Sequence, residues 1–478
     1  MSQPGAHAPQ SSYLGIDLGT SGLKLTLVGA DGGVLDEAEE PYDVSVPHPG
    51  YAETEPAEWL AAFRRALDRL PANGVPPSAA GVTGQMHGVV LAGSDGQPVR
   101  PAVLWPDQRA ADVVPQWQAL PVDARARLSN PIVAGMSGPV LSWLSAHERE
   151  SLDAATLVTF PKDWLRGQLT GDRAAERSDA SASLLWDVVA DDWSAEALGL
   201  AGVATDRLPE VVPSHDVVGE AQLLGAPVPV VAGAADAASA LLALKTTQPE
   251  QLWAESLAIN VGTGIQLLRP ETTARAREET PTHLYADADG GWYEMLAIQN
   301  GGIALSWVQK VLSLSWDAFV TSAKAAPAGS RGALFLPFLS GERGSIAPAE
   351  PNAGWSSLST AVGPAELARS AFETLAFTIR LGVEMLGGAP EQVLLSGGGA
   401  RDPWVRQLIA DVLQQPVRYV QLRSASSVGA AVLAARGVGV SLPVPATVVE
   451  VTPASHDAAA LTDAFHRWQR LVRSAQRV

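Results

Sequence analysis

Two short stretches of this 478-residue chain decide its fold, LGIDLGTSGLKL at residues 14–25 and AINVGTGIQLL at residues 258–268. In each, an apolar strand runs into a tight Gly-Thr-Ser or Gly-Thr-Gly turn, and a second apolar strand follows. Glycine lets the backbone approach a ligand closely, and Thr and Ser add hydroxyl donors, so such a turn suits phosphate oxygens. Either turn alone is equally good hairpin chemistry. The two together predict two loops that hold one nucleotide.

Asp17 comes directly before the first of these turns. A carboxylate in that place cannot bind phosphate, but it can hold Mg²⁺ through water, which is how this ion is usually held beside phosphates. The chain contains no GxxxxGK[ST] sequence, so a Walker-type P-loop does not account for the nucleotide site.

Composition sets limits on the class of protein. A length of 478 residues predicts roughly two to four domains, and 46% hydrophobic with 18% charged residues is typical of a folded globular chain. The net charge of -18 argues against a nucleic-acid partner, and the lack of cysteine excludes disulfides and thiolate chemistry. The first dozen residues do not read as a secretory signal, and no apolar run is long enough for a bilayer. We therefore expect a cytoplasmic protein with no membrane partner.

The first half of the chain reads as an α/β unit. Its expected elements are strands over 14–19, 23–30 and 33–42 in an antiparallel meander, a helix over 56–70, strands over 81–84 and 89–93, a strand over 229–232, a small-residue turn over 233–235 and a helix over 236–244. The composition becomes polar and irregular over 245–253, and we expect the domain boundary there.

The second half repeats this order after its own glycine turn. Its expected elements are a glycine-opened helix over 299–312, a helix over 366–386, a buried strand from 393 that ends in the glycine cluster 397–399, a helix over 404–413, a small-residue helix from 426 with Gly437 as its terminator, and an amphipathic helix over 457–472. The repetition suggests a duplication at the scale of a domain.

With both turns and the glycine cluster placed, the chain resembles the FGGY family of sugar kinases, most closely its xylulokinase branch. Nine segments in family order carry the resemblance: DLGTSGLK (17–24), GVTGQMHG (81–88), LWPDQR (104–109), FPKDWLRGQLTG (160–171), SDASAS (178–183), GAADAAS (233–239), NVGTG (260–264), FLPFLSGER (335–343) and SGGGARDPWVRQLIADVL (396–413).

The resemblance implies an α/β fold of two ribonuclease-H-like domains, as in the actin-like ATPase superfamily, with a cleft between them. The domains are then expected as a disordered N-terminus (1–12), a sugar-binding domain (13–248), a nucleotide-binding domain (249–440) and an extension with a helix (441–478). It also implies ATP and Mg²⁺ as cofactors, a small-molecule sugar as substrate, and a homodimer by analogy with the family.

The resemblance also assigns roles to residues. Asp236 would be the catalytic base, and Asp17 would organise Mg²⁺ and the transferring phosphate. The implied ATP-binding residues are Thr20, Ser21, Lys24, Gly262, Thr263, Gly264, Gly302, Gly398 and Gly399. The implied sugar-binding residues are Gln85, Met86, His87, Trp105 and Asp107.

Several of these residues also have simpler interpretations. Asp236, between a small-residue turn and a helix, is also what a helix N-cap looks like. His87 could be a histidine bonded only to backbone, and Met86 and Trp105 could be packing residues.

The chain departs from the xylulokinase pattern beside the base, where Ala237 stands in place of the usual Asn, and at Pro106, which replaces a polar residue. An alanine cannot bond a sugar hydroxyl, so the kinase chemistry is better supported than the identity of the sugar. We predict an ATP-dependent kinase for the terminal hydroxyl of a ketose, with conversion of D-xylulose to D-xylulose 5-phosphate as the first choice. The alternatives are a sedoheptulokinase, a ribulokinase, a gluconokinase, or a non-catalytic sugar-sensing module.

Overall fold

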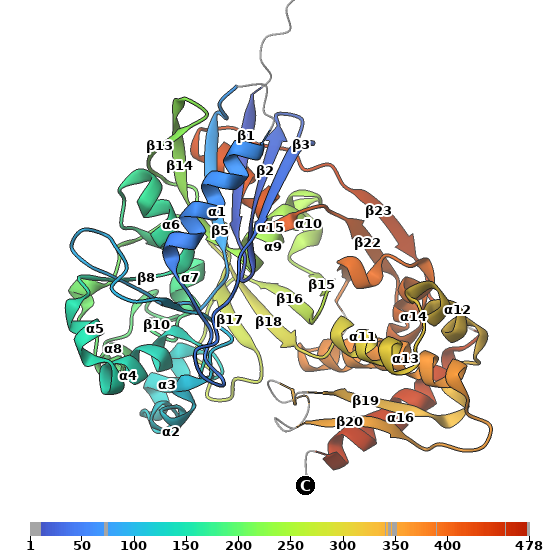
Figure 1. Cartoon of the computed structure of the whole chain (residues 1–478). Coiled ribbons are helices and arrows are strands. Elements are labelled where there is room, and N and C mark those ends of the chain that lie inside the picture. The colour runs from blue at the N-terminus through green and yellow to red at the C-terminus, as the bar shows by residue number, and fades with distance from the viewer. Residues whose placement is uncertain are drawn as a thin grey trace, which may run out of the picture.

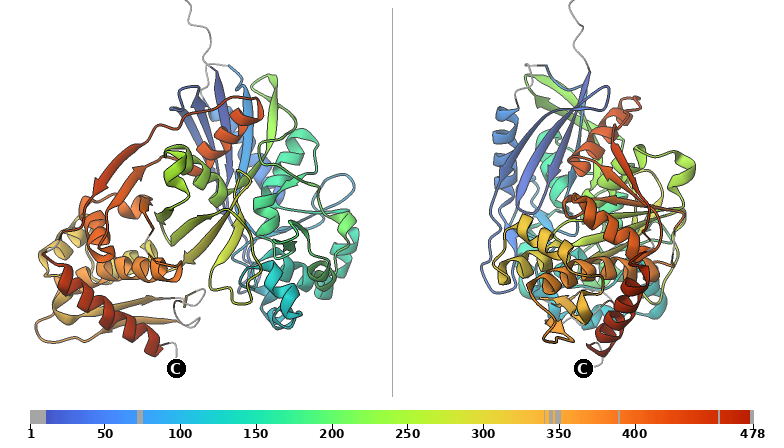
Figure 2. Two further views of the ribbon diagram at one scale, coloured as in Figure 1. Left: turned by 180° about the vertical axis from the view of Figure 1, so that it is seen from behind. Right: turned by 90° about the vertical axis from the view of Figure 1, so that its right-hand side faces the viewer.

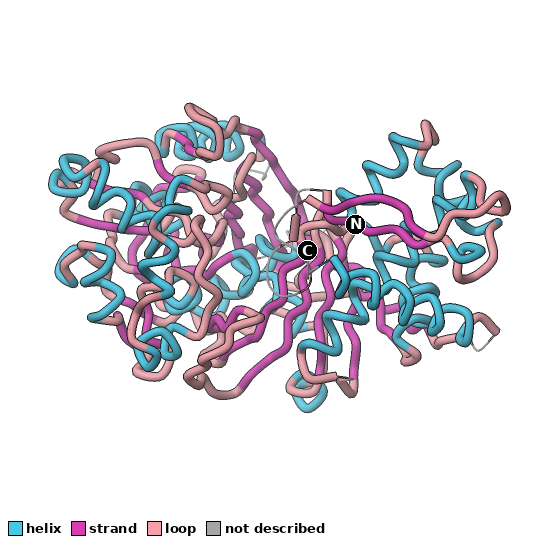
Figure 3. Tube along the Cα trace, turned by 90° about the horizontal axis from the view of Figure 1, so that it is seen from below, coloured by secondary structure: helices cyan, strands magenta, loops and turns pink. Residues whose placement is uncertain are grey.

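The computed structural model describes residues 11–70, 75–339, 341–342, 346, 351–388, 390–454 and 456–475. Within these residues the chain forms two α/β domains, each built around one mixed β-sheet, and the domains stand side by side in Figure 1. Figure 3, a view from below, shows strands through the middle of the molecule and helices gathered on both sides. The expected two-domain α/β architecture is confirmed.

The N-terminal sheet has six strands in the order β13-β14-β5-β1-β2-β3. They are β13 (Val217–Leu223), β14 (Ala226–Ala235), β5 (Ala79–Gly84), β1 (Ser12–Leu18), β2 (Gly22–Gly29) and β3 (Val34–Pro41). The strands β1, β2 and β3 form the predicted antiparallel meander, whereas β5 and β14 run parallel to β1. The carboxyl ends of β1, β5 and β14 therefore meet at one edge of the sheet.

The C-terminal sheet has seven strands in the order β17-β18-β16-β15-β21-β22-β23. They are β17 (His283–Ala286), β18 (Trp292–Ile298), β16 (Ile265–Glu271), β15 (Ser256–Val261), β21 (Gln392–Ser396), β22 (Val417–Gln421) and β23 (Thr447–Val451). The run β18-β16-β15-β21-β22 has the same order and directions as β3-β2-β1-β5-β14. The predicted duplication is thus present in the topology.

Helices and short strands surround the two sheets. In the N-terminal half they are β4 (Glu53–Thr54), α1 (Pro56–Arg69), β6 (Val90–Ala92), β7 (Ala102–Val103), α2 (Val114–Gln118), α3 (Val122–Leu128), α4 (Ser137–His147), α5 (Arg149–Ala154), β8 (Leu157–Thr159), α6 (Pro161–Thr170), β9 (Ala175–Glu176), α7 (Arg177–Ser181), β10 (Trp186–Asp187), β11 (Asp192–Trp193), α8 (Ala195–Ala201), β12 (Val211–Val212) and α9 (Asp236–Thr246). In the C-terminal half they are α10 (Glu250–Trp253), α11 (Gly302–Val311), α12 (Trp316–Ala325), β19 (Leu334–Phe338), β20 (Asn352–Ser356), α13 (Pro364–Met385), α14 (Pro403–Leu413), α15 (Ala425–Gly437) and α16 (Ala458–Ala475).

The strand β1 is buried on both faces because a helix covers each of them. Leu14, Ile16 and Leu18 point to one face, where they share a hydrophobic cluster with Trp59 of α1. Gly15 and Asp17 point to the other face, since successive side chains of a strand alternate. This alternation aims Asp17 at the side of the sheet that faces the C-terminal domain.

That second face is covered by α15, although this helix follows β22 of the other sheet (Figures 1 and 2). The approach is so close that a Cβ on Gly15 would lie 1.7 Å from the Ser427 carbonyl oxygen, and one on Gly81 would lie 2.3 Å from that of Ala430. The Oγ1 of Thr26 and the Oγ of Ser427 are hydrogen-bonded at 2.6 Å. The two domains are therefore joined by an exchanged helix as well as by the chain that links them.

Most predicted elements are confirmed, and two details are wrong. The residues 233–235 continue β14 instead of forming a turn, because Gly233, at φ +83°, makes a bulge against β5 and the strand then resumes. Gly437 does not terminate α15: it is the last helical residue, and the left-handed residue is Gly439 at φ +77°. The stretch 245–253 contains the short helix α10.

Of the segment 1–12 expected to be disordered, residues 1–10 lie outside the described part of the chain, and Ser12 already begins β1. Among the described residues, no helix has the length and apolar character that a membrane crossing requires.

Candidate active site

A cavity of about 600 Å³ lies between the carboxyl edges of the two sheets. From the N-terminal domain it is lined by Thr20, Gln85, Met86, His87, Trp105 and Asp236, and from the C-terminal domain by residues that include Asn260, Gly262, Thr263, Gly264, Gln266 and His283. A volume of this size is typical of small-molecule sites. Nine residues predicted from sequence to contact sugar, nucleotide or transferring phosphate thus line one space.

The floor on the N-terminal side comes from the segment that follows β5. Gln85 is 2% exposed, and its Nε2 donates to the carbonyl oxygen of Gly19 at 3.2 Å. Its Oε1 is buried and has no hydrogen-bond partner among the residues that the structure describes. A buried acceptor without a partner is costly, so this oxygen is well placed to accept a hydrogen bond from a bound hydroxyl.

His87, two residues further along, sits in the left-handed region at φ +68°, which is uncommon for a residue with a side chain. Its Nδ1 lies 2.6 Å from the Ala182 carbonyl oxygen, so Nδ1 carries the proton and Nε2 is the acceptor of the ring. The sequence allowed two interpretations of His87, a histidine bonded to backbone and a histidine that lines the sugar site. The structure is compatible with both at once, because one ring nitrogen bonds a backbone carbonyl and the residue also lines the cavity. Trp105 forms the neighbouring wall and donates from Nε1 to Thr20 Oγ1 at 2.9 Å, which ties this wall to the first glycine turn.

The two carboxylates that the sequence singled out, Asp17 and Asp236, end β1 and begin α9 at the same sheet edge. Burial raises the pKa of Asp236 to about 6, against the effect of a hydrogen bond that its Oδ1 accepts from the Ala237 N–H at 2.7 Å. Burial, followed by the negative charge of Asp236, raises the pKa of Asp17 to about 7. Perturbed carboxyl groups in a cleft are typical of catalytic sites.

The N-cap interpretation of Asp236 does not describe its bonding. The residue before it, Ala235, holds the N-cap position of α9, and among the described residues the Asp236 carboxylate accepts a hydrogen bond only from the Ala237 N–H. A capping side chain would instead accept from an N–H two or three residues on.

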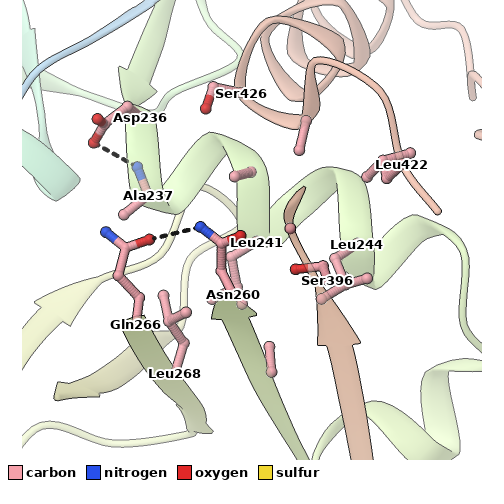
Figure 4. Close-up of a pocket in the computed structure, with 14 residues that line it drawn as sticks. Asp236, Ala237, Leu241, Leu244, Asn260, Gln266, Leu268, Ser396, Leu422 and Ser426 are labelled. Atoms are coloured by element: carbon pink, nitrogen blue, oxygen red, sulfur yellow. Dashed lines mark hydrogen bonds between the residues drawn. The ribbon is translucent and has the colours of Figure 1, made fainter. Parts of the chain in front are cut away.

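A second cavity, of about 350 Å³, opens on the other side of Asp236 and is shown in Figure 4. It lies between one face of α9 and the C-terminal sheet, and Asp236, Asn260 and Gln266 line both cavities. These three polar side chains therefore form the boundary between the two spaces.

The second glycine turn, 262–264, rests on the start of α11. The N–H groups of Gly302 and Ile303 donate to the carbonyl oxygens of Gly262 and Thr263 at 3.1 and 3.0 Å. A Cβ on Gly302 would lie 2.5 Å from the Gly262 oxygen, so packing within the protein already demands glycine there.

The glycine cluster after β21 behaves differently. A Cβ on Gly399 would lie 2.6 Å from Val261, whereas one on Gly398 would meet no protein atom within 4 Å, and Gly398 does not have a positive φ. Neither the backbone conformation nor the packing of the protein therefore requires a glycine at position 398. A ligand that lies against this position would explain the absence of a side chain.

The other predicted site residues lie beside the cavity or behind it. Ser21 is exposed in the first turn, and Lys24 on β2 pairs with Glu39 at 3.2 Å. Asp107 is fully buried, where it accepts from Arg109 Nη2 at 2.8 Å and from the Ala52 N–H at 2.7 Å. The carboxylate of Asp107 thus holds the loop behind Trp105 and does not line the cavity.

The surroundings of Asp17 fit a divalent cation. The described residues contain no cluster of three or more His, Cys, Asp or Glu side chains that could hold a metal by themselves. A cation at Asp17 would take its remaining ligands from phosphate and water, as Mg²⁺ usually does. It would also offset the negative charge that Asp236 places beside Asp17.

Sequence reasoning missed a buried charge cluster that supports Asp236 from behind. Lys162 Nζ lies 2.6 Å from Asp163, 3.1 Å from Asp179 and 3.4 Å from Glu176, and none of these side chains is more than 1% exposed. Although burial opposes it, the surrounding carboxylates raise the pKa of Lys162, so it stays charged. Lys162 and Asp163 fall in the quoted segment 160–171 and Asp179 in 178–183, whereas Glu176 lies between the two segments, and nothing in the sequence pairs them.

This cluster fixes the end of β14. Glu176 accepts a hydrogen bond from the Ser178 hydroxyl, and Ser178 Oγ in turn accepts one from the Ala235 N–H at 2.8 Å. Arg166 Nη1 donates to the Ala232 carbonyl oxygen at 2.5 Å. The backbone that leads into Asp236 is therefore held by buried charged groups.

Known proteins share both the sequence and the fold. The chain matches the N-terminal domain of the FGGY family of carbohydrate kinases over residues 12–243 and the C-terminal domain of that family over residues 257–438. It is 31% identical over 454 residues to the xylulose kinase of Escherichia coli (strain K12), with 92% of each chain covered. It is 29% identical to the xylulose kinase of Bacillus subtilis (strain 168), with 89% of this chain and 88% of the relative covered.

The structure is similar to the crystal structure of a xyloylose kinase from Brucella ovis, with a TM-score of 0.89 and 27% identity over 97% of this chain and 99% of that one. This likeness confirms the expected fold of two ribonuclease-H-like domains. The expected boundary after residue 248 lies between the two family ranges. The chain belongs to the FGGY family of carbohydrate kinases and is an ATP-dependent sugar kinase.

Proposed function

We propose that this kinase transfers the γ-phosphate of MgATP to the terminal hydroxyl of D-xylulose, giving D-xylulose 5-phosphate. The observation that carries the proposal is the position of Asp236, which lines the 600 Å³ cavity together with Gln85 and His87 and with the 262–264 turn of the other domain. The relatives named xylulose kinase support this choice of ketose. The small-molecule partners are thus a ketose and ATP.

In the proposed mechanism Asp236 accepts the proton of the attacking hydroxyl. A sugar hydroxyl is a weak nucleophile at neutral pH, and a carboxylate within hydrogen-bond reach removes its proton as the bond to phosphorus forms. The Ala237 N–H binds Oδ1 of Asp236, which leaves Oδ2 for the substrate. Gln85, His87 and Trp105 would then hold the rest of the sugar against the N-terminal domain.

The phosphates would lie between the two glycine turns. Thr20 and Ser21 would contact them from the N-terminal domain, and Gly262, Thr263 and Gly264 from the C-terminal domain. Gly398 and Gly399 would lie under the adenosine. A Mg²⁺ ion held through water by Asp17 would neutralise part of the phosphate charge. The hydrogen-bond donors of the two turns would hold the transferring phosphate in position.

The test is sugar-dependent ADP release at saturating MgATP with D-xylulose, sedoheptulose, L-ribulose, D-ribulose and gluconate. The highest kcat/KM is expected for D-xylulose. A higher value for another sugar would replace the proposed substrate. Tight sugar binding in calorimetry with no turnover on any of them would identify a sensor instead of an enzyme.

The pH dependence of the reaction should report on Asp236. The base works in its ionised form, and a pKa of about 6 means that it becomes protonated below that pH. With Mg²⁺ in excess, the cation would keep Asp17 ionised in spite of its pKa of about 7, so we expect kcat/KM for the sugar to be flat above about pH 7 and to fall roughly tenfold per pH unit below pH 6. The check is a profile over pH 5–9, with circular dichroism at each pH to confirm that the protein stays folded. A profile that stays flat down to pH 5 would contradict the assignment.

We expect Gly398 to be required for nucleotide binding but not for folding. The Gly398→Val variant places its Cβ where no protein atom lies within 4 Å, and the backbone there does not have a positive φ, so its melting temperature should change little. Its KM for ATP should rise by roughly tenfold or more, since a collision with the nucleotide costs binding energy. The matched change Gly302→Ala should instead lower the melting temperature, because its Cβ would overlap the Gly262 oxygen. An unchanged KM for ATP in Gly398→Val would remove the nucleotide from this place.

A further inference from the structure

Two amide side chains of the C-terminal domain face the base across the cavity. Asn260 on β15 and Gln266 on β16 are paired neighbours in the sheet, and both line the two cavities that meet at Asp236. Neither residue is assigned a role by the glycine-turn motif, although Asn260 opens it and Gln266 follows it. Their position brings polar groups of the nucleotide-side domain to the place where the hydroxyl would react.

The orientation of Gln266 is set by its neighbour. Asn260 Nδ2 donates to Gln266 Oε1 at 3.3 Å, so the carbonyl end of the Gln266 amide is turned toward Asn260. In Figure 4 the Gln266 nitrogen points away from Asn260, on the side of Ala237 and Asp236. Within the described part of the chain, Gln266 Nε2 has no protein acceptor. A half-buried donor is thus held at the boundary of both cavities.

The helix that carries the base offers a ligand no polar side chain beside it. Ala237 is 6% exposed and presents only a methyl group, and its N–H is taken by Asp236 Oδ1. Ala240 and Leu241, the next residues of α9 that line the second cavity, are also apolar. A polyol whose terminal hydroxyl lies on Asp236 brings its next hydroxyl to the same place. That hydroxyl loses water and needs a new partner.

We propose that Gln266 determines sugar specificity, with its Nε2 donating a hydrogen bond to the oxygen of the hydroxyl next to the one that is phosphorylated. Asn260 is the positioning residue that holds the Gln266 amide in this orientation. The inference rests on the proposed function and deepens it, because it places one sugar contact on the C-terminal domain. The sugar is then recognised by both domains, and only when they face each other across the cavity.

The test compares D-xylulose with its 4-deoxy analogue, which lacks the hydroxyl next to the terminal one. In the unmodified enzyme, kcat/KM should be roughly 10- to 100-fold higher for D-xylulose, the usual effect of one lost hydrogen bond in a closed site. In Gln266→Met this ratio should fall to within about threefold of unity, with the KM for ATP unchanged. In Asn260→Ala it should fall to an intermediate value, because the amide is present but no longer oriented.

The matched control is Gln116→Met, the same change at an exposed residue of α2, which should keep the full ratio. Should Gln266→Met fold poorly, Gln266→Asn keeps a polar amide that is one methylene too short and should lose the same discrimination. A ratio in Gln266→Met equal to that of the unmodified enzyme overturns the inference. So does a fall in kcat with an unchanged ratio, which would place Nε2 on a phosphate oxygen. If the unmodified enzyme phosphorylates no ketose, the proposed function itself is wrong. This outcome is distinct from a failure of the Gln266 inference alone, in which the unmodified enzyme is active and discriminates between the two sugars.

Discussion

Replacing Asp236 with asparagine is expected to lower kcat for sugar phosphorylation by about 10²- to 10⁴-fold, the usual contribution of a general base. The amide has nearly the same shape as the carboxylate but cannot accept the hydroxyl proton. The variant should stay folded, because the carboxylate is charged at neutral pH in a place where burial raises its pKa to about 6, and the neutral amide removes that cost. The measurement is steady-state ADP release with the melting temperature of each protein.

The control for this variant is Asp216→Asn, which neutralises an exposed carboxylate before β13 and should leave kcat unchanged. Binding of ATP should be similar in all three proteins, so that the loss appears in kcat and not in the KM for ATP. If the Asp236→Asn enzyme has the same kcat as the unmodified enzyme, a group other than Asp236 accepts the proton of the sugar hydroxyl. The assignment of the base would then be abandoned.

The second large effect is expected from Lys162→Met, which should destabilise the N-terminal domain by about 3–5 kcal/mol. Lys162 is fully buried among Asp163, Glu176 and Asp179, and methionine fills a similar volume but leaves three buried carboxylates short of a cation. The activity that remains should also fall, because Glu176 holds Ser178 and Ser178 holds the backbone before the base. The measurement is calorimetric unfolding of the Lys162→Met and unmodified proteins, with steady-state ADP release for the activity.

A comparison with Lys324→Met isolates the effect of burial. Lys324 pairs with Asp402 at 3.3 Å, but both side chains are substantially exposed, and such pairs contribute at most about 1 kcal/mol. The double change Lys162→Met with Asp179→Leu should recover part of the lost stability, since a neutralised cluster needs less compensation. Equal melting temperatures for the two single variants would show that the cluster does not stabilise the domain.

The sequence was informative where a local pattern determines local structure. The two glycine turns between apolar strands predicted both hairpins, and the alternation along β1 places Asp17 on the cleft side of its sheet. The position of Asp236 at the start of a helix after a buried strand was also readable, because carboxyl ends of parallel strands share an edge. The fold class follows from these features together with the family resemblance, which also identified nine of the residues that line the large cavity.

The sequence was uninformative where the reason for a residue lies in a distant part of the chain. Gly398 and Gly302 look alike in sequence, but packing explains only Gly302. Gln266 follows a glycine turn on an apolar strand. Its amide lines a cavity beside Asp236 because α9 packs near this strand in the folded protein. The contacts of Lys162 with Glu176 and Asp179 depend on how α6 and α7 meet behind β14, which no spacing along the chain encodes.

The exchanged helix α15 has a consequence for how this molecule can be divided. A fragment that stops in the linker between α9 and β15 would lack the cover for one face of its own sheet, with Gly15 and Gly81 laid bare. The remaining fragment would carry α15 without the N-terminal sheet against which this small-residue helix packs. Neither half is a self-sufficient unit, so gene fission at this linker would yield pieces that must reassemble before either could work.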